Sequence, residues 1–171
     1  MYPWLICAAV LAGGAVLLGV RRLRHGLVLI DVHGPSMEPT LRHGDAVLVH
    51  RVGPHRLSAG DVVVLERADL DGHWRLPPGT GAGTDLDTRN WIIKRAVAVA
   101  GDVVPATLAR TLGLPPDSRV PSGKMLVLGD NPRWSTDSRE WGFLPLDRVL
   151  GVVRRRVSPR PGATSARRGT T

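Results

Sequence analysis

The chain of 171 residues has the length of one domain, and its 43% hydrophobic and 22% charged residues exclude a chain that is disordered throughout. The formal net charge is +8, yet of 23 basic residues only Lys94 and Lys124 are lysines. Aromatic residues make up only 4%, which is too few for a base-stacking platform, so we expect no nucleic-acid partner. The single cysteine, Cys7, excludes an internal disulfide and a CxxC metal site.

The first predicted element is a transmembrane helix over residues 3–20, a segment without charge. A helix of this length spans about 27 Å, close to the roughly 30 Å hydrocarbon core of a bilayer. Arg21, Arg22 and Arg24 follow directly and would end the span at the headgroups. A cleaved signal peptide is the alternative, but no basic residue precedes the segment and no A-x-A site precedes the arginine cluster. Residues 1–24 are therefore predicted to be a single-pass anchor whose partner is the lipid bilayer.

Beyond the anchor, short β-branched runs bounded by turn residues predict strands. These runs are 27–32, 46–51, 61–65, 91–99, 125–128 and 149–157. Residues 66–90 are polar and loop-like, and the proline-rich segment 103–123 is expected to be irregular. No convincing soluble amphipathic helix is present, so residues 27–157 are predicted to form a mainly β domain, a barrel or a sandwich. The tail over 158–171 lacks core-forming residues and is predicted to be a disordered basic tail.

Ser36 is the first candidate for chemistry. It lies between Pro35 and Met37, in a turn rich in glycine and proline that follows an apolar strand. Such a turn holds a side chain in a fixed position, as a nucleophile requires. An ordinary turn serine explains this stretch equally well.

Lys94 is the second candidate, because it is followed by Arg95 within a predicted strand. Neighbouring residues of a strand face opposite sides, so one of the two basic side chains must lie among apolar neighbours. Lysine loses its proton readily when buried, whereas arginine stays charged. A buried Lys94 would be a usable general base, while a solvated strand lysine would have no such role.

The polar loop over 129–142 is the third candidate. Asp137 and Arg139 are two residues apart, so in extended backbone they share a face and can pair. Ser135 precedes them and is suited to orient a neighbouring amine. An Asx-rich surface turn is the alternative interpretation, although it does not account for so many small polar groups.

These three stretches together resemble signal peptidase I, the membrane-anchored serine peptidase family that includes the mitochondrial inner membrane peptidase. The shared motifs are G-x-S-M-x-P-T, a K-R pair ahead of G-D, and G-D-N followed by S-x-D-S-R-x-x-G, in that order, over about residues 30–152. The resemblance implies a mostly β catalytic domain with a Ser-Lys dyad. Ser36 would be the nucleophile and Lys94 the general base. The implied supporting residues are Ser135, Asp137 and Arg139, and the implied substrate-pocket residues are Val32, Met37 and Ile93.

The implied activity is a membrane-anchored serine endopeptidase that cleaves signal peptides or propeptides from precursor polypeptides after small residues, through an acyl-enzyme. No cofactor is implied, and no metal-ligand spacing such as HExxH is present. Many bacterial members have a hydroxyl residue two positions before the nucleophile, where this chain has Gly34. The family implies an extracytoplasmic catalytic domain, whereas the arginines after the span indicate the cytoplasmic side.

Three other interpretations remain open from the residues. The same chemistry would serve a dedicated maturation protease for a cytoplasmic precursor such as a nickel superoxide dismutase. His33 and His43 flank Ser36, as a Ser-His-Asp hydrolase would need. A non-enzymatic basic module on a membrane surface would use the arginines of 154–156 and 167–168.

Overall fold

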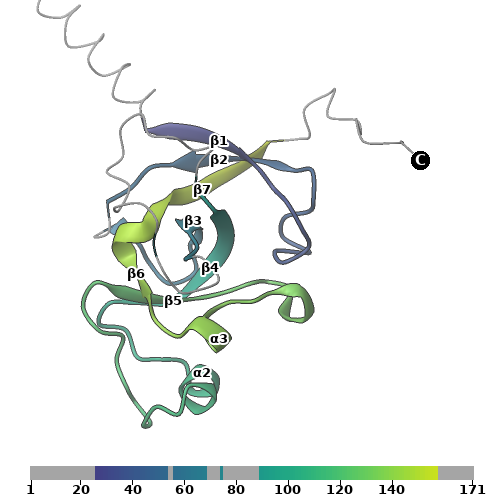
Figure 1. The fold of residues 1–171 in the computed structure, drawn as a ribbon. Coiled ribbons are helices and arrows are strands. Elements are labelled where there is room, and N and C mark those ends of the chain that lie inside the picture. Colours follow the sequence, from purple (N-terminus) through teal and green to yellow (C-terminus); the bar gives the residue numbers. More distant parts are fainter. Residues whose placement is uncertain (1–25, 54–55, 69–73, 75–88, 158–171) are drawn as a thin grey trace, which may run out of the picture.

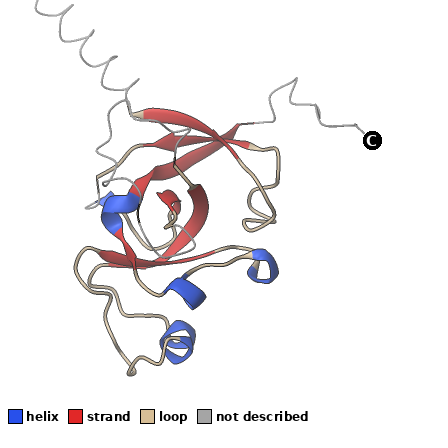
Figure 2. Cartoon of the chain, in the orientation of Figure 1, coloured by secondary structure: helices blue, strands red, loops and turns tan. Residues whose placement is uncertain are grey.

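The computed structural model describes residues 26–53, 56–68, 74 and 89–157 (Figure 1). The strands are β1 Leu27–Asp31, β2 Ala46–His50, β3 Val62–Glu66, β4 Trp91–Val99, β5 Lys124–Leu128, β6 Leu144–Pro145 and β7 Val149–Val157. The helices are α2 Ala106–Thr111 and α3 Ser138–Trp141, with the 3-10 turns η3 Pro132–Trp134 and η4 Leu146–Arg148. The prediction of a mainly β fold is confirmed (Figure 2).

The strands form one antiparallel sheet in the order β1-β2-β7-β3-β4-β5-β6. It curls into a half-barrel, with β1 and β2 on one side of the hollow and β4 and β5 on the other (Figure 1). Register shifts interrupt the β2–β7, β3–β7 and β4–β5 pairings. Such irregularities bend strands and increase their twist, which allows the sheet to curl.

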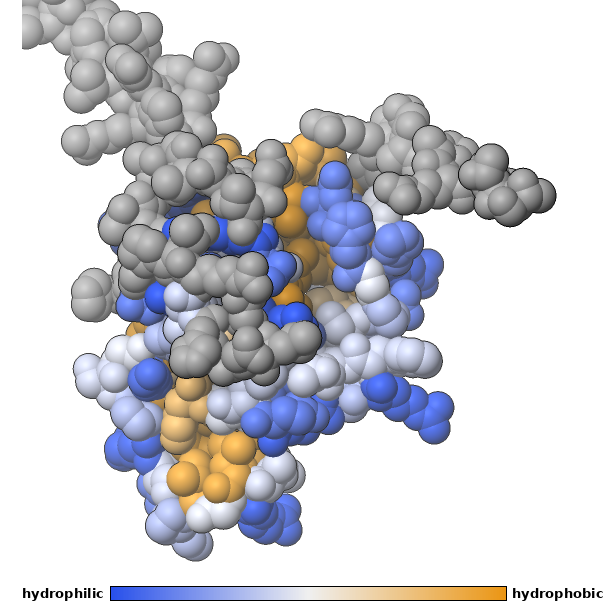
Figure 3. Space-filling model, in the orientation of Figure 1, coloured by the Kyte–Doolittle hydropathy of each residue, from blue (hydrophilic) through white to orange (hydrophobic). Residues whose placement is uncertain are grey.

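Buried aliphatic side chains form two clusters, one on each face of the sheet at β3. One includes Val63, Leu65 and Val127, and the other joins Val32 and Met37 to β2 and β3. Apolar atoms are visible in the hollow beneath β1 (Figure 3). The second cluster ties the Ser36 turn to the sheet, which fixes the position of that turn.

The six predicted strands differ from the observed ones by at most one residue at either end. The expectation that 103–123 is irregular was wrong over Ala106–Thr111, which forms α2. This helix buries Leu108 and Ala109 against β5 residue Leu126, so tertiary packing stabilises a segment too short to show helical periodicity. The sequence also did not predict α3 or the two-residue strand β6.

The predicted anchor over 1–24 and the predicted tail over 158–171 lie outside the described residues, as does most of the loop over 66–90. Within the described ranges, none of the helices has the length and apolar character needed to cross a bilayer. The transmembrane helix therefore stays a prediction.

Candidate active site

A pocket of about 450 Å³ lies at the end of β1. Both Ser36 and Lys94 line it, and so do the three residues predicted for the substrate pocket, Val32, Met37 and Ile93. Val32 and Met37 are buried, and Ile93 is partly buried. The structure thus brings two predicted reactive groups and the predicted pocket residues to one cavity.

Two strand edges flank this pocket. Among the described strands, β1 is the first of the sheet and pairs on one side only, with β2. In the described part of the chain, β5 pairs with β4 only from Arg95 onwards, so Trp91–Lys94 pairs with β3 alone. Because Leu29–Val32 and Trp91–Lys94 both line the pocket, its walls carry backbone groups that can pair with an added strand.

The turn that carries Ser36 is fastened to the loop after β5. The Asn131 N–H donates to the Ser36 carbonyl oxygen at 3.0 Å. Thr40, at the far end of the turn, donates its hydroxyl to Asp130. Arg95 binds the same Asp130 carboxylate with two nitrogens, Nε at 2.8 Å and Nη2 at 2.6 Å. These contacts hold the backbone of Ser36 in place relative to β4.

Arg95, Asp130 and Thr40 were not predicted from the sequence as residues of the site. The K-R pair and the G-D-N run contain two of them, but nothing local indicates that residues 35 positions apart form an ion pair. The pairing is visible only once β4 and the loop after β5 are placed side by side.

Lys94 is the buried member of its basic pair, with 4% of its surface exposed. Its Nζ donates to Ser135 Oγ at 2.9 Å. Burial lowers the pKa of the Lys94 amine below the 10.5 of an ordinary lysine, and the Asp137 carboxylate partly opposes that shift. A larger fraction of Lys94 is therefore neutral near physiological pH than for a solvated lysine.

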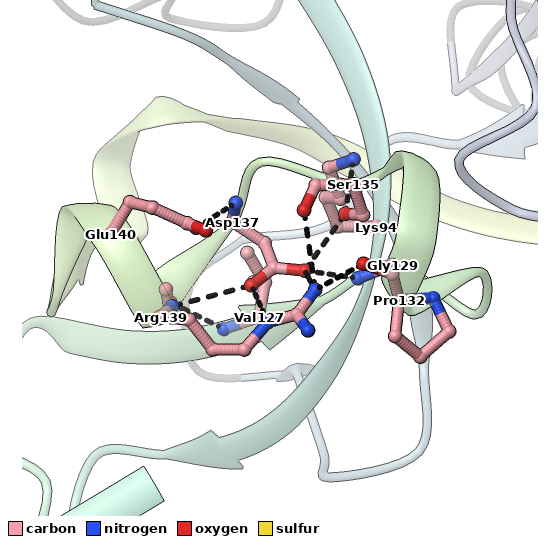
Figure 4. A network of polar contacts seen from close by, with 9 residues as sticks. Lys94, Val127, Gly129, Pro132, Ser135, Asp137, Arg139 and Glu140 are labelled. Carbon is pink, nitrogen blue, oxygen red and sulfur yellow. Dashed lines mark hydrogen bonds and ion pairs between the residues drawn. The ribbon is translucent and has the colours of Figure 1, made fainter. Parts of the chain in front are cut away.

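Asp137 is the centre of the network behind Lys94 (Figure 4). Its fully buried carboxylate accepts from Ser135 Oγ at 2.8 Å and from the Gly129 N–H at 2.9 Å. Arg139 binds it with Nε and Nη2, each at 2.9 Å. Burial alone would raise the pKa of this carboxyl, but the hydrogen bonds from Arg139, Gly129 and Ser135 bring it below 3.8.

The contact between Asp137 and Arg139 arises differently from what the sequence suggested. Asp137 is the N-cap of α3, and Glu140 completes a capping box by accepting from the Asp137 N–H. Arg139 is the second residue of that helix, and its side chain folds back onto the cap rather than lying beside it on an extended strand. The D-x-x-E spacing of Asp137 and Glu140 is the signal that predicts this cap.

The backbone at Gly129 lies close to both the Ser135 side chain and the Ser36 carbonyl oxygen. A Cβ on this residue would collide with the Ser135 side chain and lie 2.6 Å from the Ser36 carbonyl oxygen. Only glycine fits there without moving one of the two serines.

The two histidines that flank Ser36 lie close together, with ring centroids 5.8 Å apart. His43 Nδ1 accepts from the Gly34 N–H at 3.3 Å, so this nitrogen contacts the backbone of the turn. Over the described residues, no group of three or more His, Cys, Asp or Glu side chains is placed to hold a metal ion.

Comparison with known proteins gives consistent matches. The family model described as signal peptidase, peptidase S26, matches residues 4–112 and 105–158. Signal peptidase IB of Staphylococcus aureus (strain COL) is 33% identical over 149 residues, which cover 75% of this chain and 76% of that protein. The probable signal peptidase I-1 of Synechocystis sp. is 31% identical over 142 residues, covering 72% and 67%.

The mitochondrial inner membrane protease subunit 1 of Mus musculus is 29% identical over 128 residues, which cover 74% of this chain and 66% of that protein. The chain thus spans about two thirds of the length of the Synechocystis and mouse proteins.

Proposed function

The chain belongs to the signal peptidase family, peptidase S26, and from this premise we propose that it is a serine endopeptidase that removes signal peptides or propeptides from precursor proteins. Ser36 is the proposed nucleophile and Lys94 the proposed general base. The observation that carries the proposal is that Ser36 and a buried lysine line the same pocket, between two open strand edges.

In the proposed reaction, the neutral amine of Lys94 takes the proton of the Ser36 hydroxyl as its oxygen attacks the scissile carbonyl. The Ser36 N–H is a candidate donor to the developing oxyanion. The Lys94 ammonium then gives its proton to the leaving amine, and an acyl-enzyme remains on Ser36. Lys94 next takes a proton from water, which attacks the ester and releases the product.

Ser135 and Asp137 are proposed to position the base. The Ser135 hydroxyl proton points to Asp137, so its oxygen is left to accept from Lys94 Nζ. This contact fixes the direction of the amine. The Asp137 carboxylate holds Ser135 and raises the pKa of Lys94. The positive charge of Arg139, which is bound to Asp137, opposes this effect, so the pKa of Lys94 stays below its ordinary value.

The substrate is proposed to bind as a strand between the β1 edge and Trp91–Lys94. Alternate side chains of such a strand point the same way, so the first and third residues before the cut would face the pocket. Val32, Met37 and Ile93 limit the space there, which favours small residues.

Processing of a precursor by purified full-length protein in lipid or detergent tests the proposal. Ser36→Ala and Lys94→Ala should each abolish cleavage, with both variants still folded by circular dichroism. Lys124→Ala and Ser118→Ala are matched controls, because these side chains lie outside the pocket, and they should cleave like the wild type. Full activity of Lys94→Ala would overturn the proposed dyad.

Processing of a cytoplasmic precursor is the second candidate, since the arginines after residues 3–20 favour a catalytic domain in the cytoplasm. We propose export processing as the main function and membrane anchoring through residues 1–24. A reporter fused after residue 157 decides between the two locations, because a cytoplasmic signal removes the export function.

A further inference from the structure

We propose that Asp31 selects substrates with a basic side chain at the second or fourth residue before the cut. This inference rests on the proposed peptidase function and on strand-like binding of the substrate. It concerns a residue of β1 that the proposed reaction does not use.

The first observation is the direction of the β1 side chains. Val28 and Ile30 pack against the core cluster that contains Val32, so these alternate residues face inward. Leu27 and Leu29 are 41% and 39% exposed, and Asp31, on the same face, is also exposed. β1 therefore has a core-facing row and an outward row, and Asp31 ends the outward row.

The second observation is that the exposed Asp31 lines the pocket and that its carboxylate is available. Within the described residues its side chain makes no hydrogen bond or ion pair. The two basic side chains of the lining are not exposed in this way, because Lys94 is buried and Arg89 is bound to Glu66 at 2.6 Å. Asp31 is thus an exposed negative charge in a chain whose formal net charge is +8.

An added strand next to β1 alternates in the same way as β1 itself. When the first and third residues before the cut face Val32, Met37 and Ile93 at the inner wall of the pocket, the second and fourth point to the exposed side that carries Leu29 and Asp31. An ammonium or guanidinium group at one of these positions would come within reach of the Asp31 carboxylate, and a carboxylate there would be repelled. Such partly exposed charge pairs change affinity by about two- to fivefold each.

The test measures kcat/KM for synthetic precursor peptides with alanine at the first and third positions and Lys, Gln or Glu at the second or the fourth. The wild type should prefer Lys to Glu at one of these positions by about four- to twenty-five-fold, the product of one attraction and one repulsion. Asp31→Asn should reduce this preference to near one, and Asp31→Lys should reverse it. Raising the salt to about 1 M should weaken the preference, because exposed charges are then screened.

Asp117→Asn is the matched control, since it removes an exposed carboxylate in the connection after α2, and it should keep the wild-type preference. Equal cleavage of the Lys and Glu peptides by the wild type would overturn this inference alone. Cleavage of no peptide by the wild type would overturn the proposed function as well. A preference that survives in both Asp31 variants would assign the selection to another residue and overturn the role of Asp31.

Discussion

Ser135 holds Lys94 by the oxygen of its side chain: Lys94 Nζ donates to Ser135 Oγ at 2.9 Å inside a buried part of the protein. The serine hydroxyl proton is directed to Asp137 at 2.8 Å, so the serine is an acceptor toward the amine. The arrangement fixes the amine at the edge of the pocket without giving it a direct carboxylate partner.

Ser135→Ala removes that acceptor and should reduce kcat/KM by about tenfold to a hundredfold, as expected for the loss of one buried hydrogen bond. The measurement is cleavage of a precursor peptide by wild type and variant. Ser118→Ala, which loses only a turn hydrogen bond to Pro115, is the control. A Ser135→Ala enzyme with unchanged kcat/KM would show that Lys94 does not depend on this contact.

Gly129→Ala should inactivate the enzyme while leaving the sheet folded. The added methyl group would collide with Ser135 and press on the Ser36 carbonyl, so the two halves of the site must separate. Gly53→Ala is the matched control, because a Cβ at Gly53 meets no atom within 4 Å. Wild-type kcat/KM in Gly129→Ala would contradict the close packing of both serines against Gly129.

Asp137→Asn should lower the free energy of unfolding at pH 7 by about 1–3 kcal/mol, since it leaves Arg139 and the buried donors without a carboxylate. Urea unfolding of wild type, Asp137→Asn and the exposed control Asp117→Asn measures the difference. An unfolding free energy equal to that of the wild type would rule out a structural role for this ion pair.

The free energy of unfolding should also depend on pH through the Asp137 carboxylate. Its pKa is lower in the folded chain than in the unfolded chain, so its stabilisation is complete above about pH 5. As the pH falls below about 5, the unfolded chain binds the proton more readily than the folded chain, so this stabilisation decreases, and it is gone once the pH lies below the folded pKa. The difference in unfolding free energy between wild type and Asp137→Asn should therefore be constant above about pH 5 and shrink below it. A difference that is constant down to pH 2 would contradict this assignment.

Much of the fold could be predicted from local pattern. The β-branched runs correctly predicted β3 and β7, because such side chains pack well on a pleated, half-buried surface. The four-residue α3 and the two-residue β6 are shorter than any readable period, and packing against β5 determines them.

The site could be predicted where the neighbours of a residue in the sequence determine its surroundings. Alternation along the strand required that either Lys94 or Arg95 lie among apolar side chains, and the structure buries Lys94. Arg95 instead reaches Asp130 across the sheet. That contact depends on how two distant segments meet, so no local pattern contains it.

The rate of cleavage should depend on pH through the Lys94 amine. Because burial lowers the pKa of Lys94, kcat/KM should rise with pH, reach half its maximum below pH 10.5, and then level off. Peptide cleavage between about pH 5 and 10 measures the profile. A flat profile would exclude a lysine base.

The state of the Lys94 amine itself is the central claim, and NMR titration of protein labelled with ¹³C-lysine measures it most directly. The chain has only two lysines, so the spectrum contains one signal from Lys94 and one from Lys124, which Lys124→Arg identifies. The account predicts that the Lys94 signal titrates clearly below the value of about 10.4 for a free lysine side chain. A Lys94 signal that titrates at or above that value would contradict the proposed general base.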